Sequence, residues 1–311
     1  MARYQYKYRR PQRRHFQLRW LMWMLLALAL IAYPFAEPRM LTVEEHTLYV
    51  SGLPANLRNL KIVFASDIHQ GPFFSQSRVN ELVNTINNVS PDLIILGGDY
   101  AQDSDGAIEF FRNAPRFHAR LGVFGVLGDC DRTEPESNLN LLSAAMKETG
   151  CVPLVNYVTR VKVGQSYVYI AGVDDINEGT PDVEAVASQV NSGDFVILAG
   201  HSPDLMPDVL AAKAEDGNNH WFDLALFGHT HGGQVNLFGH TPFAGLMPKA
   251  GSRSLSGWLE ESRAAVLVSN SGETNDILET LRVLKSNGVC TISLTRYGKN
   301  TLAENSHIAL Y

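Results

Sequence analysis

The sequence predicts an α/β fold with more than one sheet, and three observations lead to this class. Short apolar runs rich in Val, Ile, Leu and Phe recur along the chain, as is typical of buried strands. Segments with apolar residues at helical spacing separate these runs, and such alternation is typical of α/β folds. Residues 155–173 instead resemble a hairpin, with YVYIAGV as the most strand-like part.

The predicted strands follow one another along the chain with helices between most of them. Five of them end at glycine, aspartate or histidine: residues 61–65, 93–96, 122–127, 195–199 and 224–227. Apolar residues at helical spacing predict one helix near residues 79–86 and another near residues 141–146. We expect two later apolar runs, 264–268 and 289–294, to return the chain to the sheet.

The first 38 residues differ in character from the rest of the chain. Residues 20–36 form an apolar run near the lower limit of a spanning helix, about 17 residues, and no acidic residue appears before Glu37. The flank before the run is basic and should stay in the cytoplasm, so we expect a single-pass anchor in the cell inner membrane with an extracytoplasmic domain. Arg13-Arg14 also resembles a twin-arginine export signal. A cleaved signal peptide is the alternative, but no A-x-A site follows the run.

The charge distribution and the cysteine content argue against several classes of function and of site. The formal net charge is -6, and because seven cationic residues precede Trp20, the remaining chain carries about -13. An acidic body argues against nucleic-acid binding, which requires a basic face. The 3 cysteines are Cys130, Cys151 and Cys290. Three cysteines are too few for a disulfide framework, and without a CxxC pair they do not predict a zinc site of paired cysteines.

Candidate metal ligands follow the five strand ends. They are Asp67, His69, Asp99, Asp129, His201, His229 and His231. Because ligands bind at the carboxyl ends of strands in α/β folds, we expect these side chains to converge. A mixture of carboxylates and imidazoles suits Mn²⁺, Fe²⁺ or Zn²⁺ rather than Ca²⁺. Seven ligands exceed one tetrahedral site, so we predict two divalent metal ions that share a carboxylate.

The order of these motifs resembles the calcineurin-like metallophosphoesterases. The pattern Asp-x-His, Gly-Gly-Asp, Gly-Asp-Cys-Asp, Gly-His and Gly-His-x-His runs from about residue 60, and GHTHGGQ at 228–234 is its most specific part. With the N-terminal anchor, the chain is similar to the membrane-associated, exported branch of that family. The resemblance implies a four-layer sandwich of two mixed β-sheets flanked by helices. This domain would comprise residues 39–311, after the flank and anchor of residues 1–38.

The resemblance also implies how the ligands are divided between two ions. The first ion would be held by Asp67, His69, Asp99 and His231, and the second by Asp99, Asp129, His201 and His229. Asp99 would bridge the ions, and a water activated by both cations would attack phosphorus in line with the leaving group. The implied partners are a phosphorylated small-molecule or lipid substrate and the membrane, with no nucleic acid.

Two positions depart from the usual Gly-Asn-His-Asp of the family. Asp129 stands where asparagine is usual, and its charge should hold metal tighter while weakening the Lewis acidity of the ions. Cys130 replaces the histidine that protonates the leaving oxygen, and a thiol with an ordinary pKa near 8.5 can still donate a proton. We therefore assign Cys130 and Asp131 as candidate catalytic residues, with Asp131 orienting a neighbour. A buried small residue is the alternative for Cys130, and His220 is a substitute donor.

These features favour a hydrolase of phosphodiester or pyrophosphate-type bonds. A weak acid suits a leaving group that needs little protonation, such as a nucleotide-type or aryl phosphate, and the membrane location suits a lipid-linked substrate. A UDP-2,3-diacylglucosamine-type pyrophosphatase of lipid A synthesis is one alternative, although that substrate sits on the cytoplasmic face. A degenerate, non-hydrolytic member that binds metal or lipid is another, and only Asp129 and Cys130 support it.

Overall fold

The chain divides into two compact units, Met1–Leu48 and Tyr49–Tyr311. The computed structural model describes residues 19–28, 41, 43–48, 50, 52–133, 136–231, 264–269, 290–295, 301 and 308–310. In the first unit, residues 19–28 form a helix with exposed side chains. Within the described ranges, no helix is both long and apolar enough to cross a membrane. The rest of the predicted anchor, residues 29–36, lies outside them.

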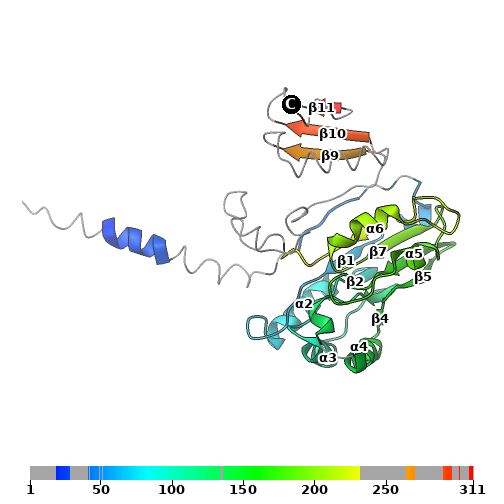
Figure 1. Ribbon diagram of the computed structural model, residues 1–311. Helices are drawn as coiled ribbons and strands as arrows, with labels where there is room; N and C mark the ends of the chain where they lie inside the picture. Colours follow the sequence, from blue (N-terminus) through cyan, green and yellow to red (C-terminus); the bar gives the residue numbers. More distant parts are fainter. Residues whose placement is uncertain are drawn as a thin grey trace, which may run out of the picture. The chain divides into compact units, whose positions relative to one another are not determined.

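The first sheet contains four parallel strands in the order β1-β2-β3-β4. They are β1 (Ile62–Ala65), β2 (Leu93–Leu96), β3 (Gly122–Gly125) and β4 (Cys151–Pro153). Three helices connect them in turn: α2 (Gln76–Asn88), α3 (Ser104–Asn113) and α4 (Glu136–Glu148) (Figure 1). Each connection is a helical crossover, which is what parallel neighbours require. Among the described strands this sheet is therefore parallel, not mixed as the family resemblance implied.

The second sheet is mixed and has the order β5-β6-β7-β8. Its strands are β5 (Tyr157–Val163), β6 (Ser166–Gly172), β7 (Phe195–Ala199) and β8 (Leu224–Leu226). β5 and β6 form an antiparallel hairpin, which confirms the prediction for residues 155–173, and the other pairs are parallel. Helices α5 (Val183–Ala187) and α6 (Met206–Ala211) and the short helix η4 (Pro203–Leu205) belong to the crossovers.

The two sheets pack face to face, with helices on their outer faces. Ile95 of β2 and Ile197 of β7 belong to one buried cluster between the sheets. Ile94 belongs to a second cluster that contains residues of α2, α3 and α4, and Val196 belongs to a third that contains residues of α5 and α6. Successive side chains of a strand point to opposite faces, so strands buried on both faces are apolar throughout. The predicted layers are helix, sheet, sheet, helix, and these contacts confirm them.

The last three strands form a sheet of their own. They are β9 (Ala264–Ser269), β10 (Cys290–Thr295) and β11 (Ile308–Leu310), in the parallel order β11-β10-β9. The expectation that residues 264–268 and 289–294 return to the main sheet is wrong for the strands that the structure describes. An apolar run indicates a buried strand but carries no information about its partner, because register and pairing are set by contacts distant in sequence.

Candidate metal centre

All seven predicted ligands lie together at the carboxyl ends of strands from both sandwich sheets. The loops after β1, β2, β3, β7 and β8 carry, in that order, Asp67 and His69, Asp99, Asp129, His201, and His229 and His231. Several contacts join the sheets at this edge, two of which involve the backbone. The backbone N–H of His229 donates to both carboxylate oxygens of Asp67 at 3.0 Å, and His201 Nδ1 lies 2.8 Å from the carbonyl oxygen of Gly97.

The backbone of these loops is unusual for residues with a side chain. Five predicted ligands have positive φ: Asp67 at 55°, His69 at 46°, Asp99 at 55°, His229 at 67° and His231 at 49°. This left-handed region is uncommon outside glycine, although Asp and His tolerate it better than most residues. Such conformations persist only where the surrounding structure holds them, and they concentrate at functional sites. The surrounding structure thus holds these loops in unfavourable backbone conformations that place the ligand side chains.

The ligands form two groups at hydrogen-bonding distance. In one, His69 Nε2 lies 3.0 Å from His231 Nε2, which lies 3.3 Å from Asp67 Oδ1. In the other, His201 Nε2 lies 3.2 Å from His229 Nδ1, and both lie near Asp129 Oδ1, at 3.2 and 3.3 Å. In each group, nitrogen and oxygen atoms with lone pairs converge on one point where a cation could bind.

Asp99 lies between the two groups. Its Oδ2 is 3.5 Å from His69 Nε2 and also 3.5 Å from His201 Nε2. Its Oδ1 accepts a hydrogen bond from the backbone N–H of Cys130 at 3.0 Å, and the side chain is buried. One carboxylate therefore faces both groups.

The donor set fits divalent cations. Two imidazole nitrogens that face each other at 3.0 or 3.2 Å compete for one proton, whereas a cation between them satisfies both lone pairs. The negative charge of the site also favours a bound cation. Burial opposes the charged form of His201, yet Asp129 and Asp99 raise its pKa to about 11. Hydrogen bonds with His201 and His229 lower the pKa of Asp129 well below its usual range. The carboxylates thus attract positive charge to this point.

Asp131 is fully buried and bonded to the backbone of the ligand loops. Its Oδ2 accepts from the N–H groups of Asp99 at 2.8 Å and Gly128 at 2.9 Å, and its Oδ1 accepts from Tyr100 N–H at 3.0 Å. Burial and the nearby Asp99 raise its pKa to about 7. The carboxylate faces backbone amides, so the contacts give Asp131 a positioning role in the loop of Asp99.

Cys130 begins the short helix η3 (Cys130–Arg132) that follows Asp129. It is a free, half-buried cysteine, and burial together with Asp99 raises the pKa of its thiol. Its Sγ lies within 4.8 Å of a ligand atom of His69 and of Asp99. The side chain is therefore part of the site, and its predicted role as a proton donor stays a prediction.

The sequence patterns did not reveal the ion pair between Arg132 and Asp174. The guanidinium of Arg132 at the end of η3 donates to Asp174 Oδ1, and both side chains are largely buried, 11% and 4% exposed. Asp174 Oδ2 also accepts from Thr180 N–H at 2.9 Å. This pair fastens η3 to the loop after β6. The partners are 42 residues apart, and no local motif marks either of them.

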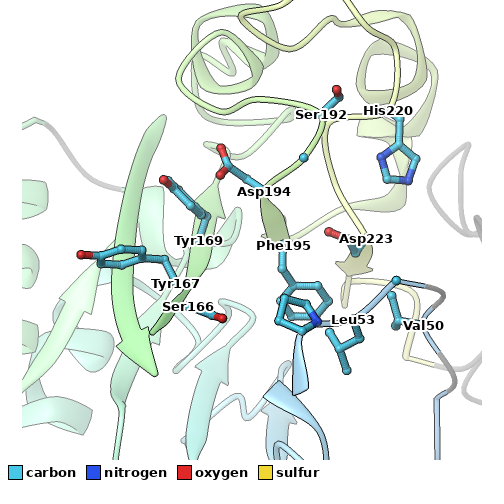
Figure 2. A pocket seen from close by; sticks show the side chains of 13 residues that line it. Val50, Leu53, Ser166, Tyr167, Tyr169, Ser192, Asp194, Phe195, His220 and Asp223 are labelled. Carbon is cyan, nitrogen blue, oxygen red and sulfur yellow. The ribbon is translucent and has the colours of Figure 1, made fainter. Parts of the chain in front are cut away.

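His220 lies away from the metal centre. It lines a cavity of about 370 Å³ at the amino ends of β6, β7 and β8, together with Ser166, Phe195 and Asp223 (Figure 2). Parallel strands place their amino and carboxyl ends at opposite edges, and β7 of five residues spans about 16 Å at 3.3 Å per residue. The idea that His220 substitutes as a proton donor at the metals is therefore wrong.

A two-sheet α/β sandwich with carboxylates and imidazoles at its strand ends defines a metal-dependent phosphoesterase. Residues 60–233, more than half of the chain, match the family model described as Calcineurin-like phosphoesterase. The chain belongs to this family.

Three relatives illustrate the similarity. An uncharacterized metallophosphoesterase of Bacillus subtilis (strain 168), YkuE, is 31% identical over 218 residues, which cover 68% of this chain and 70% of the relative. An uncharacterized metallophosphoesterase of Aquifex aeolicus is 28% identical over 70% of this chain and 80% of its own length. A transmembrane protein with metallophosphoesterase domain from Bos taurus is 28% identical over 64% of this chain and 46% of its own length.

Two further matches concern a solved structure and the end of the chain. The phosphopantetheinyl hydrolase PptH of Mycobacterium tuberculosis gives a TM-score of 0.37 at 14% identity, covering 54% of this chain and 82% of that one. Residues 246–311 match a second family model, described as SIS domain. This segment contains β9, β10 and β11.

Proposed function

We propose that this protein is a dinuclear-metal phosphoesterase that hydrolyses phosphodiester or pyrophosphate-type bonds. The observation that carries the proposal is the position of Asp99, whose Oδ2 lies 3.5 Å from His69 Nε2 in one group and from His201 Nε2 in the other. Two ions that share a bridging carboxylate, about 3.5–4 Å apart, need a ligand in this position.

We assign four ligands to each ion, with Asp99 shared. The first ion takes Asp67, His69, Asp99 and His231, and the second takes Asp99, Asp129, His201 and His229. Bound Mn, Fe or Zn ions would supply Lewis acidity toward a phosphoryl oxygen and lower the pKa of a water molecule. The chain itself fixes the ligand directions. The backbone N–H of His229 orients Asp67, and Asp131 holds the loop of Asp99.

The substrate that we propose is a phosphorylated small molecule or a phosphorylated lipid. The apolar run at residues 20–36 and the transmembrane description of the Bos taurus relative support a membrane-bound location. A lipid-linked pyrophosphate of the UDP-2,3-diacylglucosamine type is the specific alternative. This substrate requires the domain to face the cytoplasm, so the side of the membrane on which the domain lies tests this alternative.

We propose that the domain after residue 38 lies on the extracytoplasmic side of the inner membrane, because the seven cations before Trp20 favour retention of the flank in the cytoplasm. Alkaline phosphatase fused after Tyr311 should be active, since this reporter needs the oxidising compartment beyond the membrane. Green fluorescent protein fused at the same position should stay dark after Sec export. A fluorescent fusion combined with an inactive phosphatase fusion would reverse the proposed orientation and favour the cytoplasmic lipid substrate.

We also propose a division of the chain that is narrower than residues 39–311 for the phosphoesterase domain. The matched family region ends at residue 233, and the segment similar to a SIS domain begins at residue 246. Residues 49–311 form one compact unit, and within it the separate sheet of β9, β10 and β11 supports a boundary between these two positions.

Metal analysis of Asp99→Ala tests the two-ion assignment. The variant should lose both ions and lower kcat/KM for bis(4-nitrophenyl) phosphate with added Mn²⁺ by at least about 100-fold, since it removes a ligand of each. Asp92→Ala is the matched control, because Asp92 precedes β2 at the opposite end of the strand. It should keep both ions.

Two results would contradict the proposal in different ways. Retention of two ions by Asp99→Ala would remove the bridging role. A wild-type protein that binds two ions but turns over no monoester, diester or nucleotide-lipid would support the non-hydrolytic alternative instead.

A further inference from the structure

Cys130 lies within reach of two ligands assigned to the first ion. Its Sγ, a ring nitrogen of His69 and a carboxylate oxygen of Asp99 all lie within 4.8 Å of one another. The backbone N–H of Cys130 donates to Asp99 Oδ1 at 3.0 Å, so the residue is held against the carboxylate that faces both groups. The side chain is half-buried, so the sulfur is not sealed in the core.

We propose that Cys130 is itself a metal ligand, and that its thiolate coordinates the first ion together with His69 and Asp99. The inference rests on the proposed dinuclear function and adds an eighth ligand to the seven. Since Zn–S bonds are about 2.3 Å and Zn–N bonds about 2.0 Å, ligand atoms on one ion lie up to about 4.3 Å apart. A group within 4.8 Å therefore needs only a small side-chain adjustment. The thiol proton passes to solvent as the sulfur–metal bond forms.

Asp129 and Cys130, at the start of η3, would then provide ligands to both ions. Asp129 groups with His201 and His229, whereas Cys130 groups with His69 and Asp99. Two consecutive residues thus direct their side chains to different ions.

A thiolate on the first ion alters which metals the site prefers. Thiolate ligands favour Zn²⁺ over Mn²⁺, whereas carboxylates and imidazoles accept either. The first position is therefore selective for zinc and the second, which has only oxygen and nitrogen ligands, is less so. A protein loaded from mixed metals should hold unlike ions.

Cobalt spectroscopy of the full chain tests the sulfur ligand directly. After chelation and loading with Co²⁺, the wild-type protein should bind two ions per chain and show a thiolate-to-cobalt charge-transfer band in the near ultraviolet. Cys130→Ser should lose this band while it still binds two ions, and its preference for Zn²⁺ over Mn²⁺ should fall about 10-fold or more. Cys151→Ser is the control, because Cys151 is buried in β4 and belongs to none of the ligand groups found in the described residues. It should keep the band.

The outcomes separate this inference from the proposed function. Two bound cobalt ions without a charge-transfer band in the wild-type protein would overturn the thiolate ligand and leave the dinuclear site intact, with Cys130 free for proton donation. A band that persists in Cys130→Ser would overturn it as well. Failure of the wild-type protein to bind cobalt at all would overturn both proposals. The wild-type spectrum decides the question even if the serine variant does not fold.

Discussion

Asp131 is buried, and both of its carboxylate oxygens accept hydrogen bonds from backbone N–H groups. Two of these donors, Asp99 and Gly128, flank the metal centre on neighbouring loops. A carboxylate can accept at both oxygens, so one side chain bonds both loops, including that of Asp99, whose φ is 55°. The residue therefore contributes to the site through Asp99 rather than through contact with substrate.

We predict that Asp131→Asn weakens both folding and metal binding. The amide has one accepting oxygen, so its NH₂ group would face N–H donors and leave at least one of them unsatisfied. The metal-free variant should lose about 1–3 kcal/mol of unfolding free energy in urea, and its Zn²⁺ affinity should fall about 10-fold or more. Asp105→Asn, an exposed change on α3, is the control and should stay within about 0.5 kcal/mol of the wild type. Unchanged metal affinity in Asp131→Asn would rule out the positioning role.

Single residues were predictable where they stand in a local pattern. Each of the seven ligands follows an apolar run and most lie beside small residues, so Asp67 and His201 could be found from sequence alone. The hydrogen-bond partners of Asp131 could not be predicted, because almost every residue has a backbone N–H group and the residue type does not show which one donates. The side chain of Arg132 was missed for a similar reason, since its partner Asp174 is specified only by the packing of two sheets.

At the scale of elements, the strands lie close to their predicted positions. Residues 93–96 and 195–199 are β2 and β7, and residues 122–127 overlap β3. These strands are buried on both faces, so their continuous apolar runs define them well. The pairing of the strands was harder to predict from the sequence, as the separate sheet of β9, β10 and β11 shows. Helix η3 was also unexpected, because it is a single short turn held by the loops around it.

The ion pair of Arg132 and Asp174 should anchor η3 to the second sheet. We predict that Arg132→Met lowers the unfolding free energy by about 3 kcal/mol, since it leaves a buried carboxylate without its cation. Arg120→Met is the matched control. Arg120 pairs with Asp92 at 2.8 Å, but its side chain is 62% exposed, so its loss should cost under about 1 kcal/mol. Urea unfolding of both metal-free variants gives the comparison, and equal losses would contradict the anchoring role.

At the scale of the molecule, the candidate metal centre draws its residues from both sheets of the sandwich. The first sheet supplies Asp67, His69, Asp99 and Asp129, and the second supplies His201, His229 and His231. Neither sheet carries a complete ligand set for either proposed ion. Metal binding should therefore stabilise the packed sandwich rather than any one element.

We predict that only the sandwich gains stability from metal and that the segment containing β9, β10 and β11 does not. A ligand that binds only the folded state at about 1,000 times its Kd adds about 4 kcal/mol. For a domain of this size, each kcal/mol raises the Tm by about 2–4 °C. Calorimetry of the full chain should show two transitions, with one moving upward by about 8–16 °C when Zn²⁺ is added. A single transition, or two that shift together, would mean that the final sheet unfolds with the phosphoesterase domain and that the boundary between residues 233 and 246 is not a domain boundary.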